Sequence, residues 1–160
     1  MLKHHQPDFF SSDNLIKNLR ASKINYFTSH PYLMIVKIDT KEKFTVIAPE
    51  EAVLSANMAE EFTDLLKGRM AEAVPHVVLN METVQHIDKI LAARIAEIQQ
   101  EFYENNLSFV VCCLSSAVEE EFDRPGFLET MNVTPTESEA WDIIQMEEIE
   151  RELLDDNFDN

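Results

Sequence analysis

The fold is decided by residues 77–114, which read VVLNMETVQHIDKILAARIAEIQQEFYENNLSFVVCCL. Two apolar runs, 77–81 and 109–114, are typical of strands covered on both faces, and the second is the most apolar run of the chain. Between them, apolar residues recur at spacings of four, three and four, which indicates a helix; they are Leu91, Ile95, Ile98 and Phe102. Asp88 is a natural cap for its start, and Asn105 and Asn106 end it. A strand, a helix and a second strand in this order predict parallel pairing.

The residues before this stretch predict a hairpin and a helix. The segments 33–38 and 44–48 are rich in β-branched residues, and the polar turn 39–43 joins them. Asn57 with Glu60 forms a potential capping box for a helix that extends to about Met70. An initial hairpin followed by alternating strands and helices indicates an α/β fold with a mixed, mainly parallel sheet.

The residues after it predict two more helices with a short strand between them. Ser116 with Glu119 forms a second potential capping box, for a helix that ends near Phe122. Residues 131–133 predict the last strand, and Thr136 can cap the final helix. That helix has an apolar stripe made of Ile143, Met146, Ile149 and Leu153. The expected total is about five strands and about four helices.

The chain divides into three parts. Residues 1–28 are expected to be a weakly structured extension, in which Leu15, Ile16 and Leu19 could line a short helix. Residues 29–154 form the α/β domain, and residues 155–160 form an acidic tail that should fray.

Charge and composition limit the classes of partner. The formal net charge is −17, with +3 on residues 1–43 and −20 on residues 44–160. This field disfavours nucleic acid and anionic membranes, whose binding requires cationic side chains. It would steer a basic protein partner toward the domain, or it could serve solubility alone. There is no apolar run long enough to cross a membrane and no secretory signal, so we expect a cytoplasmic protein.

Sequence features of common catalytic and cofactor sites are missing. With two glycines in the chain, no phosphate-binding loop is possible, and no pair of histidines has the spacing of a zinc helix. His86 lies near Asp88, but a loop histidine beside a helix cap explains the pair better than catalysis does. Cys112 and Cys113 are interpreted as small core residues, because neighbours on a strand point to opposite faces and a disulfide between them is implausible. We expect no enzyme, no metal and no cofactor.

The stretch from Lys43 to Leu154 resembles a STAS domain of the kind found in anti-sigma-factor antagonists, and its ending resembles small STAS proteins of the Bacteroidetes. The motifs that carry the resemblance are 77–81 with 84–88, 109–112 with 115–118 and 122, and 139–151. The resemblance implies a STAS-like fold and a protein partner that docks at the start of the second helix. It places the partner-binding residues at Asp88, Lys89, Ile90, Leu91, Ser115 and Ser116.

The resemblance also implies a departure from the family's switch. Phosphorylated members open this helix with Asp-Ser-Ser-Gly or a close variant, and a phosphate at the second hydroxyl position breaks the complex. Here Asp88 is followed by Lys89, Ile90 and Leu91, so the hydroxyl and the glycine are both missing. We therefore expect a regulator that is not phosphorylated at this position.

Three hypotheses follow for function. The first is a protein-binding regulator whose partner is an anti-sigma factor or another kinase-like switch protein. The second is a STAS-type scaffold subunit of a transport or signalling assembly, which an exposed apolar stripe on the last helix would favour. The third is an enzyme or small-molecule receptor, which would need a deep pocket with perturbed titratable groups. The sequence leaves a homodimer open.

Overall fold

A mixed sheet runs through the centre of the molecule. The computed structural model describes residues 24–29 and 32–158. Within these residues six strands form the main sheet, in the order β1-β2-β3-β5-β7-β8. They are β1 (Ile24–Ser29), β2 (Tyr32–Thr40), β3 (Thr45–Pro49), β5 (Val77–Asn80), β7 (Phe109–Cys112) and β8 (Val133–Thr134). β1, β2 and β3 pair antiparallel, and all later pairs are parallel.

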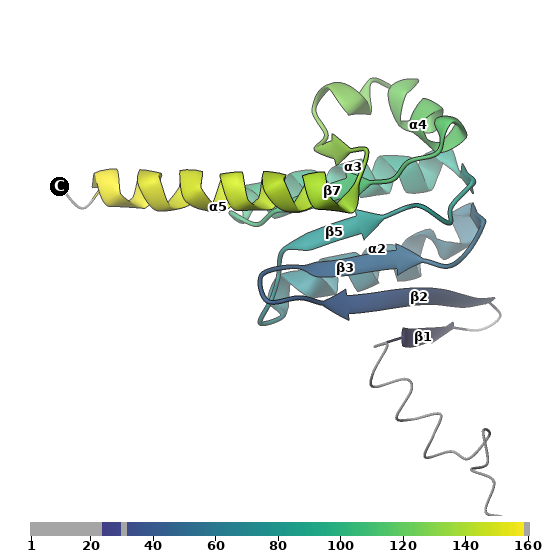
Figure 1. The fold of residues 1–160 in the computed structure, drawn as a ribbon. Helices are drawn as coiled ribbons and strands as arrows, with labels where there is room; N and C mark the ends of the chain where they lie inside the picture. The colour runs from purple at the N-terminus through teal and green to yellow at the C-terminus, as the bar shows by residue number, and fades with distance from the viewer. Residues whose placement is uncertain (1–23, 30–31, 159–160) are drawn as a thin grey trace, which may run out of the picture.

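Four helices accompany this sheet. They are α2 (Ala59–Gly68), α3 (Lys89–Glu104), α4 (Ser116–Asp123) and α5 (Glu137–Phe158). Three of them lie on the two faces of the sheet, and α4 packs against α3 (Figure 1). In Figure 1, α2 and α3 lie behind the sheet and α5 crosses in front of it, with its C-terminal half extending beyond the strands. Three 3₁₀ turns lie at Ala56–Met58, Arg69–Ala71 and Phe127–Glu129. The expected α/β class with a mainly parallel sheet and four helices is confirmed.

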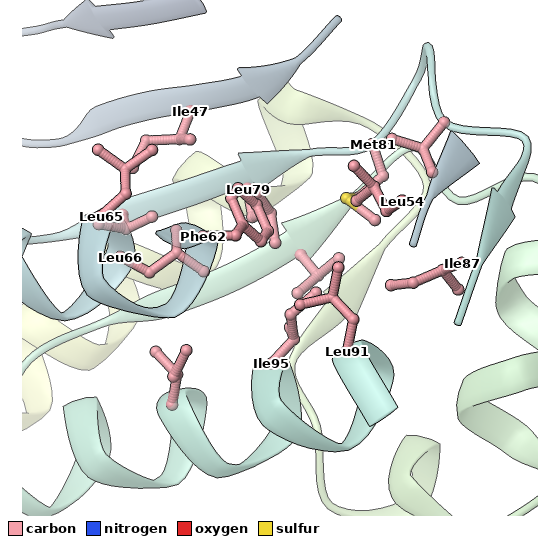
Figure 2. Close-up of a cluster of buried hydrophobic side chains, with 14 of the residues drawn as sticks. Ile47, Leu54, Phe62, Leu65, Leu66, Leu79, Met81, Ile87, Leu91 and Ile95 are labelled. Atoms are coloured by element: carbon pink, nitrogen blue, oxygen red, sulfur yellow. The ribbon is translucent and has the colours of Figure 1, made fainter. Parts of the chain in front are cut away.

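The hydrophobic core has a large layer and a small layer. The large layer lies between the sheet and the helices α2 and α3. Figure 2 shows side chains that the sheet contributes, such as Leu79, and side chains that the helices contribute, such as Phe62, Leu91 and Ile95. The small layer lies under α5 and consists of Val46, Val78, Val110, Cys112, Ala140 and Ile144. All four residues of β7 are buried, which confirms that this strand is covered on both faces.

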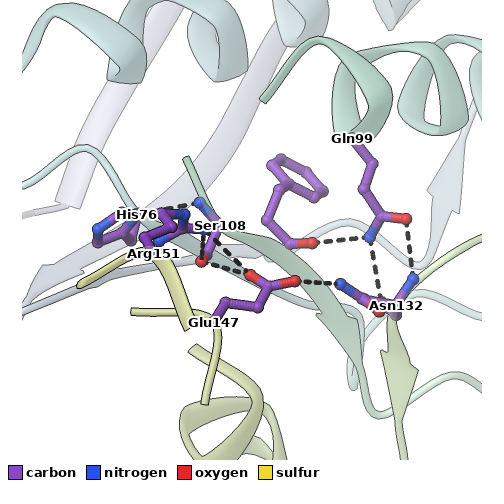
Figure 3. A network of polar contacts seen from close by, with 7 residues as sticks. His76, Gln99, Ser108, Asn132, Glu147 and Arg151 are labelled. Carbon is purple, nitrogen blue, oxygen red and sulfur yellow. Dashed lines mark hydrogen bonds and ion pairs between the residues drawn. The ribbon is translucent and has the colours of Figure 1, made fainter. Parts of the chain in front are cut away.

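Polar contacts hold α5 against the end of the sheet (Figure 3). Glu147 of α5 accepts hydrogen bonds from the hydroxyl of Ser108 and from Nδ2 of Asn132, the latter at 2.8 Å. Arg151, one turn further along α5, donates to Ser108 Oγ at 2.7 Å. Ser108 is fully buried, so these bonds satisfy polar groups that would otherwise cost stability.

The ends of the sheet and of the last helix differ from expectation. β1 pairs with β2 along its whole length, although residues 24–28 were expected to belong to an extension. The short helix expected around residues 15–19 lies outside the described residues. α5 continues to Phe158, four residues beyond the expected end, and its C-terminal half extends beyond the strands (Figure 1).

Helix caps were predicted correctly in two of four positions. Asp88 caps α3, with Oδ1 accepting from the Ile90 amide at 2.8 Å, and Thr136 caps α5 by accepting from the Glu139 amide at 3.2 Å. The capping box at Asn57 is wrong, because Asn57 lies inside the 3₁₀ turn that precedes α2. Ser116 is not the cap of α4 either, because Ser115 takes that role and accepts from the Val118 amide at 3.4 Å.

Candidate functional site

The starts of α3 and α4 lie at the same edge of the sheet. β5 and β7 pair in parallel, with Asn80 opposite Cys112, so the chain leaves both strands on the same side. The connection after β5 contains β6 (His86–Ile87), which pairs with β4 (Val53–Leu54) before α3 begins. α4 packs against both β6 and α3. The structure therefore brings the two predicted segments, 88–91 and 115–116, to one end of the molecule.

The start of α3 separates a structural residue from an exposed one. Asp88 is half-buried and satisfies a free amide of the first helical turn. Lys89 is exposed, and Ile90 leaves 51% of its surface in solvent. Leu91 is fully buried in the large core layer, where it contributes to folding (Figure 2). The inclusion of Leu91 among the partner-binding residues is therefore wrong, because its side chain faces the sheet.

The start of α4 offers one free hydroxyl. Ser115 is partly buried and its side chain is engaged as the helix cap. Ser116 is exposed. Ser116 is thus the hydroxyl of this pair that a partner could reach.

A groove between α2 and α3 is lined in part by Ile90. Its volume is about 450 Å³, and its lining includes Ala56, Ala59, Thr63, Lys67, Ile90 and Arg94. The hydroxyl of Thr63 is buried and has no hydrogen-bond partner among the described residues. Val53 on β4 is a second large apolar side chain that is half-exposed at this end. Neither the groove nor Val53 could be predicted from the sequence, because both depend on how β4, α2 and α3 pack together.

The titratable groups of the described residues do not converge on this end. Burial and the nearby Arg151 lower the pKa of His76, but His76 lies at the far end of β5, where Nδ1 accepts from the Ser108 amide at 3.0 Å. His86 is exposed. Within the described residues, no three His, Cys, Asp or Glu side chains are grouped as metal ligands would be. Exposed apolar side chains that are grouped at one end of a protein are a common feature of protein-binding surfaces.

The outer face of α5 carries a second apolar surface. Met146, Ile149 and Leu153 are each 57–59% exposed, whereas Ala140 and Ile144 on the opposite side are buried under the helix. Of the predicted stripe, Ile143 alone packs against the core. In the described part of the chain, no helix combines the length and the apolar character that a membrane crossing requires.

Comparison with known proteins agrees with this architecture. The family described as the STAS domain matches residues 36–140. A STAS domain protein from Planctomyces limnophilus superimposes with a TM-score of 0.61 at 18% identity, covering 69% of this chain and 97% of that one. An anti-sigma factor antagonist from Mycobacterium paratuberculosis gives 0.60 at 16% identity, covering 74% and 99%.

A larger protein contains the same fold as one of its parts. The murine solute carrier 26 family member A9, an anion transporter, gives a TM-score of 0.57 at 12% identity, covering 84% of this chain and 24% of that one. Among curated proteins, none is similar enough to count as a match.

Proposed function

Because this chain belongs to the STAS domain family, we propose that it is a non-enzymatic regulator that binds a protein partner, in the manner of an anti-sigma-factor antagonist that lacks the phosphoserine switch. The single observation that carries the proposal is the exposed Ile90, next to the cap of α3. The exposed half of this isoleucine is available for contact, and burying it against a partner would stabilise a complex.

The proposed surface comprises the start of α3, the groove beside it and the start of α4. Asp88 supports it as the helix cap, Lys89 and Ile90 contact the partner, and Ser116 lies at its margin. Ser115 acts by holding the start of α4. Val53 extends the apolar part of the surface at the same end of the molecule.

Regulation at the start of α3 does not use a phosphorylated hydroxyl. Residues 85–96 contain no serine, threonine or tyrosine, so a kinase has no acceptor at the start of α3. In phosphorylated relatives, the added charge would disrupt the packed interface. The partner of this chain would therefore be released by another route, such as its own conformational change.

The partner is an anti-sigma factor or another kinase-like switch protein with a basic docking face. Residues 44–160 carry a net charge of −20, which raises the association rate with a basic surface and opposes self-association. The proposed place of action is the cytoplasm. A homodimer through this end would have to overcome that repulsion.

The test uses a partner captured from the native host. It compares how tightly this partner binds two variants of the chain, each of which carries one added carboxylate. Ile90→Glu places a carboxylate at the centre of the proposed surface, where its desolvation should weaken binding at least tenfold. It should leave the fold intact, because an acidic residue is favoured in the first turn of a helix. Ile149→Glu places the same charge on the outer face of α5, at a position of similar exposure, and should bind as wild type does.

A second candidate function is favoured by the exposed stripe on α5. A scaffold subunit that docks through Met146, Ile149 and Leu153 would lose its partner with Ile149→Glu and keep it with Ile90→Glu. If both variants bind the partner as tightly as wild type and keep its melting temperature, both proposed surfaces are contradicted. Unfolding of Ile90→Glu would show that Ile90 belongs to the core.

A further inference from the structure

The two adjacent cysteines lie against each other at the end of β7. β7 ends at Cys112, and Cys113 adopts a left-handed backbone with φ of 62°, which residues other than glycine rarely take. This turn brings the Sγ atoms to 3.6 Å from one another. The expectation that the two side chains point to opposite faces is therefore wrong, because Cys113 has already left the strand.

The two thiols differ in access. Cys112 is fully buried in the small core layer, and burial raises the pKa of its thiol. Cys113 is partly exposed. Backbone hydrogen bonds hold the pair in place: the Cys113 amide donates to the Thr134 carbonyl at 3.2 Å, and the Met81 amide donates to the Cys112 carbonyl at 3.0 Å. A small reagent can thus reach Cys113, and Cys112 stands behind it as a second sulfur.

We propose that Cys112 and Cys113 form a reversible thiol–disulfide modification site that reacts with low-molecular-weight disulfides such as glutathione disulfide. The Cys113 thiolate attacks one sulfur of the small disulfide, forms a mixed disulfide and releases one small thiolate. The sulfur of Cys112 then attacks Cys113 Sγ and expels the second small thiolate, which takes up the Cys112 proton. In total, two protein thiols are oxidised to one disulfide, and one small disulfide is reduced to two thiols.

The geometry makes this disulfide easy to reverse. Adjacent Cα atoms are about 3.8 Å apart across a trans peptide, whereas disulfide-linked residues usually have Cα atoms about 4.4–6.8 Å apart. The ring is therefore strained, and strained disulfides are the more oxidising and more labile ones. It would close two residues before Ser115, the cap of α4, so oxidation would act on the loop that leads to the proposed partner surface.

The experiment treats the full-length reduced protein with glutathione disulfide and measures intact mass. Wild type should lose about 2 Da without keeping an adduct, because two thiol protons leave, and dithiothreitol should restore the original mass. Cys112→Ala should keep one glutathione on Cys113, since no second thiol is left to expel it. Cys113→Ser should stay unmodified under native conditions, because its remaining thiol is buried.

Four results would overturn the proposal. Wild type could fail to react, could keep the glutathione adduct, or could form a disulfide between two chains. Rapid modification of folded Cys113→Ser would also contradict it. Should a variant fail to fold, peptide mapping of oxidised wild type decides the matter, because both cysteines must be linked within one peptide. This test does not depend on partner binding, so its outcome is separate from that of the proposed function.

Discussion

A glutamine buried in α3 allows a sharp test of how the helix is attached to the sheet. Gln99 is 7% exposed, and its Nε2 donates to the Phe109 carbonyl at 2.7 Å and to the Asn132 carbonyl at 3.1 Å. Its Oε1 accepts from the Asn132 amide at 2.9 Å (Figure 3). The side chain thus bridges β7 to the residue just before β8. Gln99→Glu keeps the shape of the side chain and replaces the donor with an oxygen.

The cost of this change can be estimated from the bonds it removes. Two donated hydrogen bonds at about 1 kcal/mol each set a lower limit of about 2 kcal/mol. Two buried carbonyls would then face a carboxylate, which raises the expected loss of unfolding free energy to about 3–4 kcal/mol. Burial and these carbonyls should raise the pKa of the new carboxyl group in the folded state. The loss should therefore be largest at neutral pH and shrink as the pH falls toward the unfolded pKa of about 4.3, because a protonated carboxyl can donate again.

The neighbouring residue provides a matched control. Gln100 is exposed, and its Nε2 donates to Glu104 Oε1 at 3.1 Å in solvent. Gln100→Glu makes the same chemical change on the same helix and should cost about 0.5 kcal/mol or less, from like charges one turn apart. Urea unfolding followed by circular dichroism measures both variants, with the midpoint shifting and the slope unchanged. Equal midpoints for the two variants would refute the bridging role of Gln99.

Three further predictions concern stability. Val111→Asp places an unpaired charge in the fully buried strand β7 and should cost more than about 4 kcal/mol in thermal or urea unfolding; a wild-type melting curve would mean that β7 is peripheral. The pKa of His76 is lowered in the folded protein, chiefly by burial and then by Arg151. The contribution of His76 to stability is therefore present above the unfolded pKa of about 6.5 and is lost as the pH falls from there through the lower folded pKa. The stability difference between wild type and His76→Asn should follow that direction from pH 8 to pH 5, and a flat difference would argue against it. Asp88→Ala removes the cap of α3 and should lower the unfolding free energy by about 1 kcal/mol, whereas Asp88→Asn, which keeps an accepting oxygen, should lose less; identical losses would show that the cap bond contributes nothing.

The order of elements could be predicted from the sequence because it depends on local patterns. The apolar runs of β5 and β7, and the helical spacing from Leu91 to Phe102, are properties of neighbouring residues. Asp88 and Thr136 are caps for the same reason, since a cap bonds within three residues of itself. The sequence alone therefore determined the α/β class, the parallel centre of the sheet and the position of the α3 start.

Packing between distant segments decided the remaining features. β1 belongs to the sheet because β2 offers it a free edge, and its strand-favouring residues could not by themselves show that this edge is available. The stripe on α5 has the spacing of a core-facing helix, yet Met146, Ile149 and Leu153 face solvent because Ala140 and Ile144 already occupy the sheet side.

Packing between distant segments also decides which residues of the candidate site are exposed and which are buried. Ile90 and Leu91 are neighbours of similar hydrophobicity, and the rotation of about 100° between helix positions sends one to solvent and the other into the core. The contact between Cys112 and Cys113 likewise depends on one left-handed residue at the end of a strand. Periodicity specifies which residues share a face, but which face is covered is determined by elements far away in the sequence, and that is visible only in the tertiary structure.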